Sequence, residues 1–250
     1  MTEQNKKVVS DYNGYDYKKI FWEDADRKYE DMADRLAIRR LLPAKMDTFV
    51  DIAGGYGCLA KEYLDRAKVA TLFDYSQTEL DQAKEEFGDR IRTVQGDIYH
   101  TPFKDDEFSA LLMVRATHHF ADLPAVIKEL HRILEPGGVA VIEVANKRTL
   151  PKMFRYWFKK SKVNPFDKKP SNLKNIDKDG FYNYHPAYVE DLFRKSGFEI
   201  DNILSVSNFR SQTMKKIFKT KALVALEKKL QKPLASLRFA PSIYYRLIKK

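Results

Sequence analysis

The stretch Thr48-Phe49-Val50-Asp51-Ile52-Ala53-Gly54-Gly55-Tyr56-Gly57-Cys58-Leu59-Ala60 decides the fold of this chain. An apolar run breaks abruptly into a glycine-rich turn and then into a helix-compatible segment, which predicts a buried strand that turns tightly into a helix N-terminus. Glycines let a backbone approach a ligand closely, and the unpaired N–H groups at a helix start favour a carboxylate or a phosphate. We therefore expect a ligand site at this turn.

Two cofactor classes use such a turn, and glycine spacing helps to separate them. A dinucleotide fingerprint requires Gly-x-Gly-x-x-Gly, whereas here Gly55 and Gly57 are followed by Ala60 at the third position. The order Asp51-x-Ala53-x-Gly55-x-Gly57 instead resembles the first motif, Asp-x-Gly-x-Gly-x-Gly, of the class I S-adenosylmethionine-dependent methyltransferases. Ala53 departs from that motif. Its methyl group is tolerable at negative φ, but it could push the backbone away and weaken cofactor binding.

Further motifs follow in the order found in the same family. Residues 101–108 resemble the Leu-Pro-Phe-x-Asp-x-x-Phe-Asp stretch of methyltransferases related to ubiquinone and menaquinone biosynthesis enzymes, with Ser109 where that family often has Asp. Residues 132–138 resemble its Leu-x-Pro-Gly-Gly turn. Joint occurrence of such motifs by chance is far less probable than that of a lone glycine motif. The resemblance covers residues 25–205.

The resemblance implies an α/β, Rossmann-like fold with a doubly wound seven-stranded sheet and helices on both faces. Apolar runs predict its strands at residues 49–52, 69–73, 91–95, 110–114, 139–144, 198–206 and 240–248. We expect the last strand to lie antiparallel beside the fifth, which gives the order 3-2-1-4-5-7-6. An amphipathic C-terminal membrane helix is the alternative for residues 240–248, and Pro241 with the β-rich run after it favours the strand.

The chain has the length of one domain, so we expect residues 1–250 to form a single methyltransferase domain. An aromatic N-terminal segment, residues 1–23, either covers the cofactor pocket as a lid or packs on the core. Residues 147–184 form a basic, irregular insertion on the substrate side, with aromatic residues among lysines.

The resemblance also assigns residues to the cofactor, S-adenosylmethionine. Its amino-acid end is bordered by the turn residues Ala53, Gly54, Gly55 and Gly57, while Asp51 holds the turn. Asp74 ends the second strand at the place where a carboxylate accepts both hydroxyl protons of a ribose. Its alternative role is that of a surface residue beside the helix cap formed by Ser76 and Glu79.

The third and fourth strands contribute the remaining cofactor residues. Gly96, Asp97 and Ile98 follow strand three, where the acid accepts the adenine amine and the apolar side chain lies against the ring, with Tyr75 as the opposite wall. Val114, Arg115 and Ala116 follow strand four and approach the methyl group, because ligands of open α/β sheets bind beyond the carboxyl ends of the strands.

His118 and His119 are the candidates for a catalytic base, and orienting or packing roles are the alternative. The sequence predicts no metal site, because adjacent histidines point in different directions and no second ligand cluster accompanies them. Tyr184 and His185 are further candidates for substrate contact. Cys58 has no recognisable partner, so a packed side chain is favoured over a nucleophile.

The formal charge of +10 is unevenly distributed. Residues 147–178 carry a net +9 and residues 211–250 a net +10, which leaves −9 for the rest of the chain. Positive charge at this density suits an anionic small-molecule substrate, nucleic acid or a membrane surface, and solvated helix faces are the alternative. The single cysteine predicts a reducing, cytoplasmic environment, and we expect neither a signal peptide nor a membrane span.

These observations favour a methyltransferase for a small-molecule acceptor. A methyltransferase for RNA or for a membrane-associated lipid or quinone is the second hypothesis, motivated by the two basic segments. A cofactor-binding protein without catalysis, in which Ala53 reflects relaxed constraints, is the third.

Overall fold

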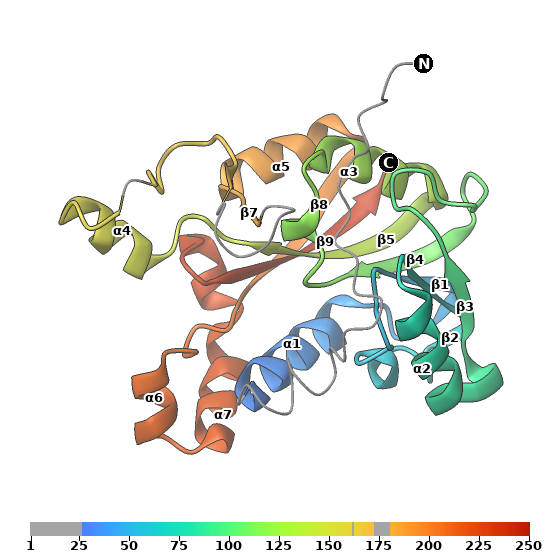
Figure 1. Ribbon diagram of the computed structural model, residues 1–250, viewed down its shortest axis with the longest axis horizontal. Coiled ribbons are helices and arrows are strands. Elements are labelled where there is room, and N and C mark those ends of the chain that lie inside the picture. The colour runs from blue at the N-terminus through green and yellow to red at the C-terminus, as the bar shows by residue number, and fades with distance from the viewer. Residues whose placement is uncertain (1–26, 162, 173–180) are drawn as a thin grey trace.

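The computed structural model describes residues 27–161, 163–172 and 181–250 of the chain (Figure 1). Seven of its strands form one sheet in the order β3-β2-β1-β4-β5-β9-β8, and the two-residue strands β6 and β7 pair separately. β9 lies antiparallel between β5 and β8. The order predicted from the sequence is therefore confirmed, as is the strand at the C-terminal end. The aromatic segment 1–23 lies outside the described residues.

The strands are β1 (Met46–Ile52), β2 (Ala67–Asp74), β3 (Arg92–Gln95), β4 (Phe108–Met113), β5 (Leu134–Ala145), β6 (Ser171–Asn172), β7 (Tyr182–Asn183), β8 (Phe198–Val206) and β9 (Ser242–Lys249). The helices are α1 (Lys28–Leu41), α2 (Gln77–Phe87), α3 (Leu123–Ile133), α4 (Leu150–Trp157), α5 (Pro186–Lys195), α6 (Gln212–Ile217) and α7 (Thr220–Leu230). Short 3-10 turns are η2 (Ala60–Glu62), η3 (Gly88–Arg90), η4 (Thr117–His119) and η5 (Pro233–Leu237).

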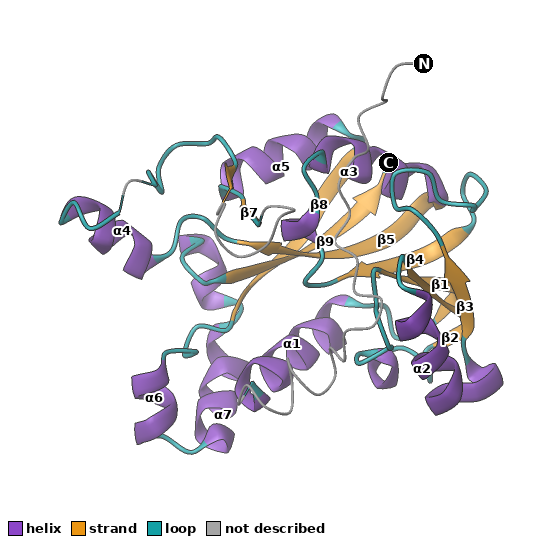
Figure 2. Cartoon of the chain, in the orientation of Figure 1, coloured by secondary structure: helices purple, strands orange, loops and turns teal. Residues whose placement is uncertain are grey.

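Helices cover both faces of the sheet, and each face has its own apolar core (Figure 2). α3 and α5 pack on one face through residues such as Ile127 and Phe193. α1, α2 and α7 pack on the other face through residues such as Ile38. β5 serves both cores, because Ile142 faces the first and its neighbour Val141 the second, as the alternation of a strand requires. Such near-continuous apolar strands are typical of a sheet covered on both faces.

The start of β5 differs from the sequence prediction more than the start of any other strand of the sheet. β5 begins at Leu134, because Leu134 pairs with Phe108 before the register shifts, so Pro136-Gly137-Gly138 lies within the strand instead of before it. The basic insertion 147–184 contains α4 and the β6–β7 pair. Within the described ranges, no helix is both long and apolar enough to cross a bilayer.

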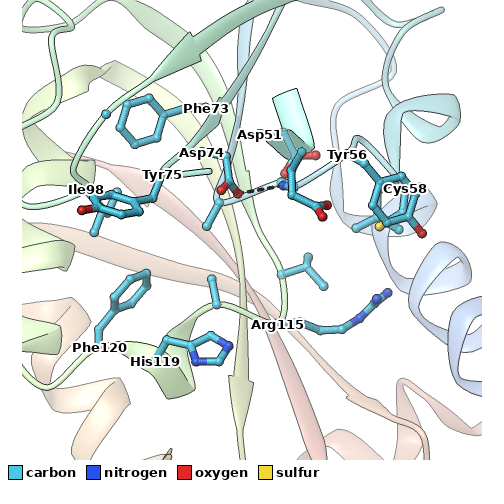
Figure 3. Close-up of a pocket in the computed structure, with 18 residues that line it drawn as sticks. Asp51, Tyr56, Cys58, Phe73, Asp74, Tyr75, Ile98, Arg115, His119 and Phe120 are labelled. Atoms are coloured by element: carbon cyan, nitrogen blue, oxygen red, sulfur yellow. Dashed lines mark hydrogen bonds between the residues drawn. The ribbon is translucent and has the colours of Figure 1, made fainter. Parts of the chain in front are cut away.

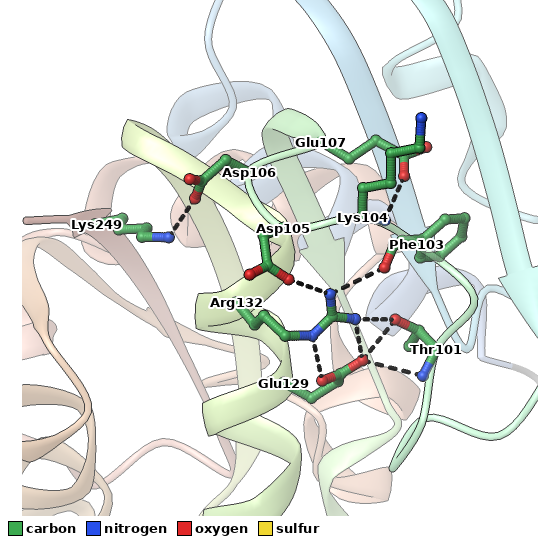
Figure 4. Close-up of polar contacts among 9 residues, drawn as sticks. All are labelled: Thr101, Phe103, Lys104, Asp105, Asp106, Glu107, Glu129, Arg132 and Lys249. Carbon is green, nitrogen blue, oxygen red and sulfur yellow. Dashed lines mark hydrogen bonds and ion pairs between the residues drawn. The ribbon is translucent and has the colours of Figure 1, made fainter.

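The stretch 101–108 has a structural role at the start of β4 (Figure 4). The Arg132 guanidinium on α3 donates to the Phe103 carbonyl at 2.9 Å and pairs with Asp105 at 2.7 Å. It also pairs with Glu129 at 2.6 Å, and Glu129 accepts from the backbone N–H of Thr101 at 3.0 Å. One side chain therefore fastens the loop before β4 to the helix after it.

We expect Arg132→Met to lower the free energy of unfolding by about 2 kcal/mol, because it removes several charge-assisted hydrogen bonds from a partly buried side chain. Chemical denaturation checks this. Arg90→Met is the matched control, since among the described residues Arg90 pairs only with Asp65 and both side chains are exposed. Equal losses in the two variants would contradict the assigned role of Arg132.

Candidate functional site

The glycine-rich turn after β1 is built from residues in the left-handed region. Ala53, Gly55 and Gly57 have φ angles of 54°, 56° and 76°. The Ala53 methyl group would be tolerable at a negative φ, but the φ of Ala53 is positive. A left-handed conformation costs a residue with a Cβ about 1–2 kcal/mol, so Ala53 is held there by its surroundings.

The helix predicted directly after this turn is wrong. The chain instead makes successive tight turns, in which Gly57 N–H donates to Gly54 O at 3.0 Å and Ala60 N–H to Gly57 O at 2.9 Å, before the short η2. Alternating left-handed residues prevent the uniform backbone that an α-helix needs. The anion-binding property of a helix N-terminus therefore does not apply here.

Asp74 connects the turn to the end of β2. Its Oδ2 accepts from the Gly55 N–H at 2.8 Å, and its Oδ1 accepts from the Ser76 N–H at 2.9 Å (Figure 3). Burial raises the pKa of Asp74, and the backbone N–H donors partly offset that shift. Each carboxylate oxygen has two acceptor sites, so both can accept a further proton from a ligand.

A pocket lies beyond the carboxyl ends of β1, β2 and β4, with Tyr75 and Ile98 at one end and Tyr56 and Cys58 at the other (Figure 3). The residues that line it are Asp51, Ala53, Gly54, Gly55, Tyr56, Cys58, Leu59, Phe73, Asp74, Tyr75, Glu79, Gly96, Ile98, Val114, Arg115, Ala116, His119 and Phe120. The pocket therefore combines an apolar slot with two carboxylates from neighbouring strands.

Asp51 is the more deeply buried of these two carboxylates, with 2% of its surface exposed. Burial raises its pKa to about 7, and the negative charge of Asp74 adds to the increase, whereas Tyr63 and Arg115 oppose it. Among the described residues, its Oδ2 has no hydrogen-bond partner. A buried acceptor without a partner is costly, so the pocket suits a ligand that carries a positive donor at this end.

Arg115 lies between two further buried acids. Its guanidinium pairs with Asp34 of α1 at 2.9 Å, and its backbone N–H donates to Glu143 of β5 at 3.1 Å. Burial raises the pKa of Glu143 to about 7, and the charge of Asp34 raises it further. Arg115 also has a positive φ of 57°. These contacts fix the backbone at the end of β4, where the pocket floor lies.

The two candidate histidines lie in different surroundings. His119 lines the pocket, whereas His118 lies outside it and stacks on Phe181 with ring centroids 4.1 Å apart. Burial lowers the pKa of His118 far below its usual range, with His119 and Arg115 adding to the shift. His118 therefore stays neutral and packed, and His119 is the histidine positioned to meet a ligand.

Tyr184 and His185 have structural contacts instead of a place in the pocket. The Tyr184 hydroxyl donates to Phe120 O at 2.7 Å, and His185 caps α5 by accepting from the Ala187 N–H at 3.2 Å. Burial raises the pKa of Cys58 to about 11, which keeps the thiol protonated. Within the described residues, no group of three or more His, Cys, Asp or Glu side chains is placed to hold a metal ion.

Comparisons with known proteins point to one enzyme class. The family described as a methyltransferase domain matches residues 50–142. A ubiquinone/menaquinone biosynthesis C-methyltransferase of Paracoccus denitrificans is 30% identical over 118 residues, which are 44% of this chain and 47% of that protein. Residues 50–142 therefore resemble a methyltransferase domain. The matched segments span less than half the length of the first curated relatives.

Solved structures of methyltransferases share this fold over nearly the whole chain. The 1,6-didemethyltoxoflavin-N1-methyltransferase of Burkholderia thailandensis, solved with S-adenosylhomocysteine, has a TM-score of 0.61 at 14% identity and covers 91% of this chain and 82% of its own. The [4+2]-cyclase SpnF has a TM-score of 0.56 at 17% identity, covering 88% and 81%. At these identities the likeness shows the fold alone, and one fold hosts different reactions.

The Burkholderia thailandensis enzyme was solved with S-adenosylhomocysteine, the product of the cofactor predicted from this sequence, S-adenosylmethionine. The residues predicted for it that line the pocket are Asp51, Ala53, Gly54, Gly55, Asp74, Tyr75, Gly96, Ile98, Val114 and Arg115. Gly57 and Asp97 do not line it, and Asp97 instead accepts from the Tyr99 N–H at 2.9 Å. Their assigned cofactor contacts stay predictions, as do those of the lining residues.

Several residues that line the pocket were not predicted from the sequence. Phe73 and Phe120 line the pocket from β2 and from the segment after η4, and Glu79 approaches it from α2. Phe73 ends the strand predicted at residues 69–73, and no local pattern distinguishes it from the other apolar residues of that strand. Of these residues, only Phe120 could have been predicted to line the pocket, because it directly follows the histidine pair after β4.

We expect Ala53→Gly to raise the free energy of unfolding by about 1 kcal/mol, because it relieves a left-handed Cβ at a modest entropic cost in the unfolded chain. Relaxation of the turn should also tighten S-adenosylhomocysteine binding. Calorimetric unfolding and titration measure the two effects. Ala60→Gly, at a buried position outside the left-handed region, is the control and should destabilise the fold. A destabilised Ala53→Gly variant would contradict the prediction.

We expect the affinity for S-adenosylhomocysteine to rise severalfold from pH 6 to pH 7, because Asp51 must ionise, at a pKa of about 7, to attract an ammonium group. Isothermal titration at several pH values checks this. Asp51→Asn should abolish the pH dependence. Asp47→Asn, at an exposed side chain on the same strand, should preserve it.

The same ionisation affects stability without ligand. The folded-state pKa of Asp51 exceeds its unfolded value of about 3.9, so its stabilising contribution is complete below that value and is lost as pH rises towards 7. The unfolding temperature of the ligand-free protein should therefore fall from pH 5 to pH 7. Asp51→Asn should reduce this slope but not remove it, because Glu143 titrates in the same range.

Proposed function

We propose that this protein transfers the methyl group of S-adenosylmethionine to a small-molecule acceptor. The observation that carries the proposal is the pair of carboxylates on the tips of β1 and β2, both of which line one pocket with an apolar slot beside them. Asp51 suits the ammonium group of the cofactor, because its Oδ2 is buried and has no partner among the described residues. Asp74 suits the ribose diol, because both its oxygens can accept another proton.

The apolar slot suits the adenine ring. Ile98 is buried, and Tyr75 is 41% exposed in the absence of a ligand, so a flat ring between them would cover apolar surface. Phe73 lines the same end of the pocket. The methyl group would then lie near Val114 and Ala116, at the carboxyl end of β4.

The cofactor supplies an electrophilic methyl group on a sulfonium sulfur. Held by Asp51 and Asp74, it would donate this methyl group to a lone pair of the acceptor, and the electrons of the carbon–sulfur bond would stay on sulfur. The residues of the chain align the two partners and exclude water, since Val114 and Ala116 are buried and apolar. His119, which lines the pocket, is positioned to take a proton from the acceptor.

A second acceptor class is favoured by one surface feature. Leu150, Phe154, Trp157 and Phe158 are exposed on and just after α4, within the basic segment 147–178. This pattern also suits RNA or a membrane-associated lipid or quinone as the acceptor.

A cytoplasmic location and a single domain over residues 1–250 stay predictions.

The test incubates the protein and radiolabelled-methyl S-adenosylmethionine with separated RNA, protein, lipid and small-molecule fractions of a cell extract. We expect label in the small-molecule fraction. Asp74→Ala should abolish labelling and weaken S-adenosylhomocysteine binding by roughly 30-fold or more, because two charge-assisted hydrogen bonds are lost. His119→Ala should lower the turnover rate without weakening cofactor binding.

His118→Ala and Asp81→Ala are the matched controls, because His118 lies outside the pocket and Asp81 is on the exposed face of α2. Label in the RNA or lipid fraction would establish the second acceptor class instead. Tight S-adenosylhomocysteine binding with no labelled fraction would favour a cofactor-binding protein without catalysis. Absence of binding would refute the assigned pocket roles.

A further inference from the structure

A second cavity lies in the basic insertion, apart from the cofactor pocket. Its charged lining residues are all cationic: Lys147 follows β5, and Lys152 and Arg155 belong to α4. Polar side chains of Ser161 and Asn183 also line it. No carboxylate is among the described residues that line this cavity. Figure 1 shows α4 at the edge of the molecule, next to the end of β5.

Among the described residues, no carboxylate neutralises the cations of this cavity. Lys147 is only 3% exposed, and its Nζ donates to the backbone oxygens of Asp167 at 2.9 Å and Lys169 at 2.7 Å. Lys152 Nζ donates to Asn146 O at 3.1 Å. Carbonyl oxygens satisfy N–H groups but leave the charge in place. In the described part of the chain, neither lysine nor Arg155 forms an ion pair with a carboxylate.

The lowered pKa values of the two lysines also indicate positive charge that is not compensated. Burial lowers the pKa of Lys152 to about 8, and repulsion from Arg210 and Lys147 adds to the shift. Burial also lowers the pKa of Lys147, and the charge of Asp167 offsets only part of that. Asp167 itself is exposed. Unpaired buried cations are costly, so a bound anion would remove a penalty that the protein otherwise carries.

We propose that this cavity binds an oxyanion group, a phosphate or a carboxylate, between Lys147, Lys152 and Arg155. The two ammonium groups supply point charges, and the Arg155 guanidinium supplies the forked donors that match such a group. Ser161 and Asn183 add neutral polar groups. This binding does not depend on methyl transfer.

Tyr184 connects the oxyanion site to the cofactor pocket through hydrogen bonds. Asn183 lines the oxyanion site, and the next residue, Tyr184, donates its hydroxyl proton to Phe120 O, whose residue lines the cofactor pocket. Tyr184 also accepts from the Lys147 N–H at 2.9 Å. If the proposed methyl transfer holds, the site lies on the acceptor side of the pocket, which suits an acceptor with an anionic group.

The first experiment titrates the full chain with inorganic phosphate and with citrate by calorimetry, at constant ionic strength and without S-adenosylmethionine. Lys152→Gln combined with Arg155→Gln should weaken binding at least about tenfold, because two charge-assisted contacts are lost. Lys159→Gln combined with Lys160→Gln is the matched control, since it removes the same charge from exposed positions of the same segment outside the cavity. The control should keep the affinity within about twofold.

Two sources of the oxyanion are separated by a second experiment with phosphatidylcholine vesicles, with and without phosphatidic acid. Exposed Phe154 and Trp157 on α4 make a lipid headgroup a source to test. Binding of the free anions that fails in the Lys152/Arg155 variant supports a soluble ligand. Vesicle binding that requires phosphatidic acid and fails in the same variant supports a headgroup.

Absence of binding in every arm would overturn the proposal, and so would equal losses in the variant and its control, which would indicate diffuse surface charge. Circular dichroism checks that the variants fold. If the double variant does not fold, Arg155→Gln alone replaces it, because this side chain is exposed. Since no arm contains S-adenosylmethionine, a failure here is distinct from a failure of the proposed methyl transfer.

Discussion

The hydrogen bond from the Gly55 N–H to Asp74 Oδ2, 2.8 Å long, is the contact on which the site depends. It ties the turn after β1 to the end of β2, so two neighbouring strands share one ligand-binding edge. A left-handed Gly55 is needed to aim this N–H at the carboxylate. The same geometry places Ala53 in the left-handed region and leaves no room for a regular helix after the turn. Strain at Ala53 is thus a consequence of how the pocket is made.

Buried charge is the second constraint on this molecule. On the cofactor side, acids are in excess around Arg115, and burial holds the pKa values of Asp51 and Glu143 at about 7. On the insertion side, Lys147 is buried and Lys152 is half-buried, and neither has a carboxylate partner in the described part of the chain. The cofactor side therefore has an excess of acidic groups, and the insertion side has an excess of cationic groups. A ligand with a cationic end suits the first side and a ligand with an anionic group suits the second.

The basic segments therefore have more than one physical character. Much of their charge is on exposed lysines such as Lys159 and Lys160, which contribute to the surface potential and to nothing local. A smaller part of the charge is on Lys147, Lys152 and Arg155, which line the proposed oxyanion site. The sequence count of +9 over residues 147–178 cannot separate the two, because lysines in both surroundings contribute equally to it.

By itself, the sequence determined the strand order, the antiparallel last strand and most of the residues on the pocket edge. The strand order and the direction of the last strand follow from the resemblance to the methyltransferase family. Local signals gave the rest: apolar runs set the strands, glycines set the turn, and acids directly after strands must lie at the carboxyl edge of a parallel sheet. Tertiary structure decided the rest. Contacts between distant segments decide which of His118 and His119 lines the pocket and why Ala53 has a positive φ. They also leave Asp51 Oδ2 without a partner among the described residues and place Lys152 in the lining of the second cavity. No local pattern encodes them, because burial and pairing are properties of the assembled neighbours and not of the residue.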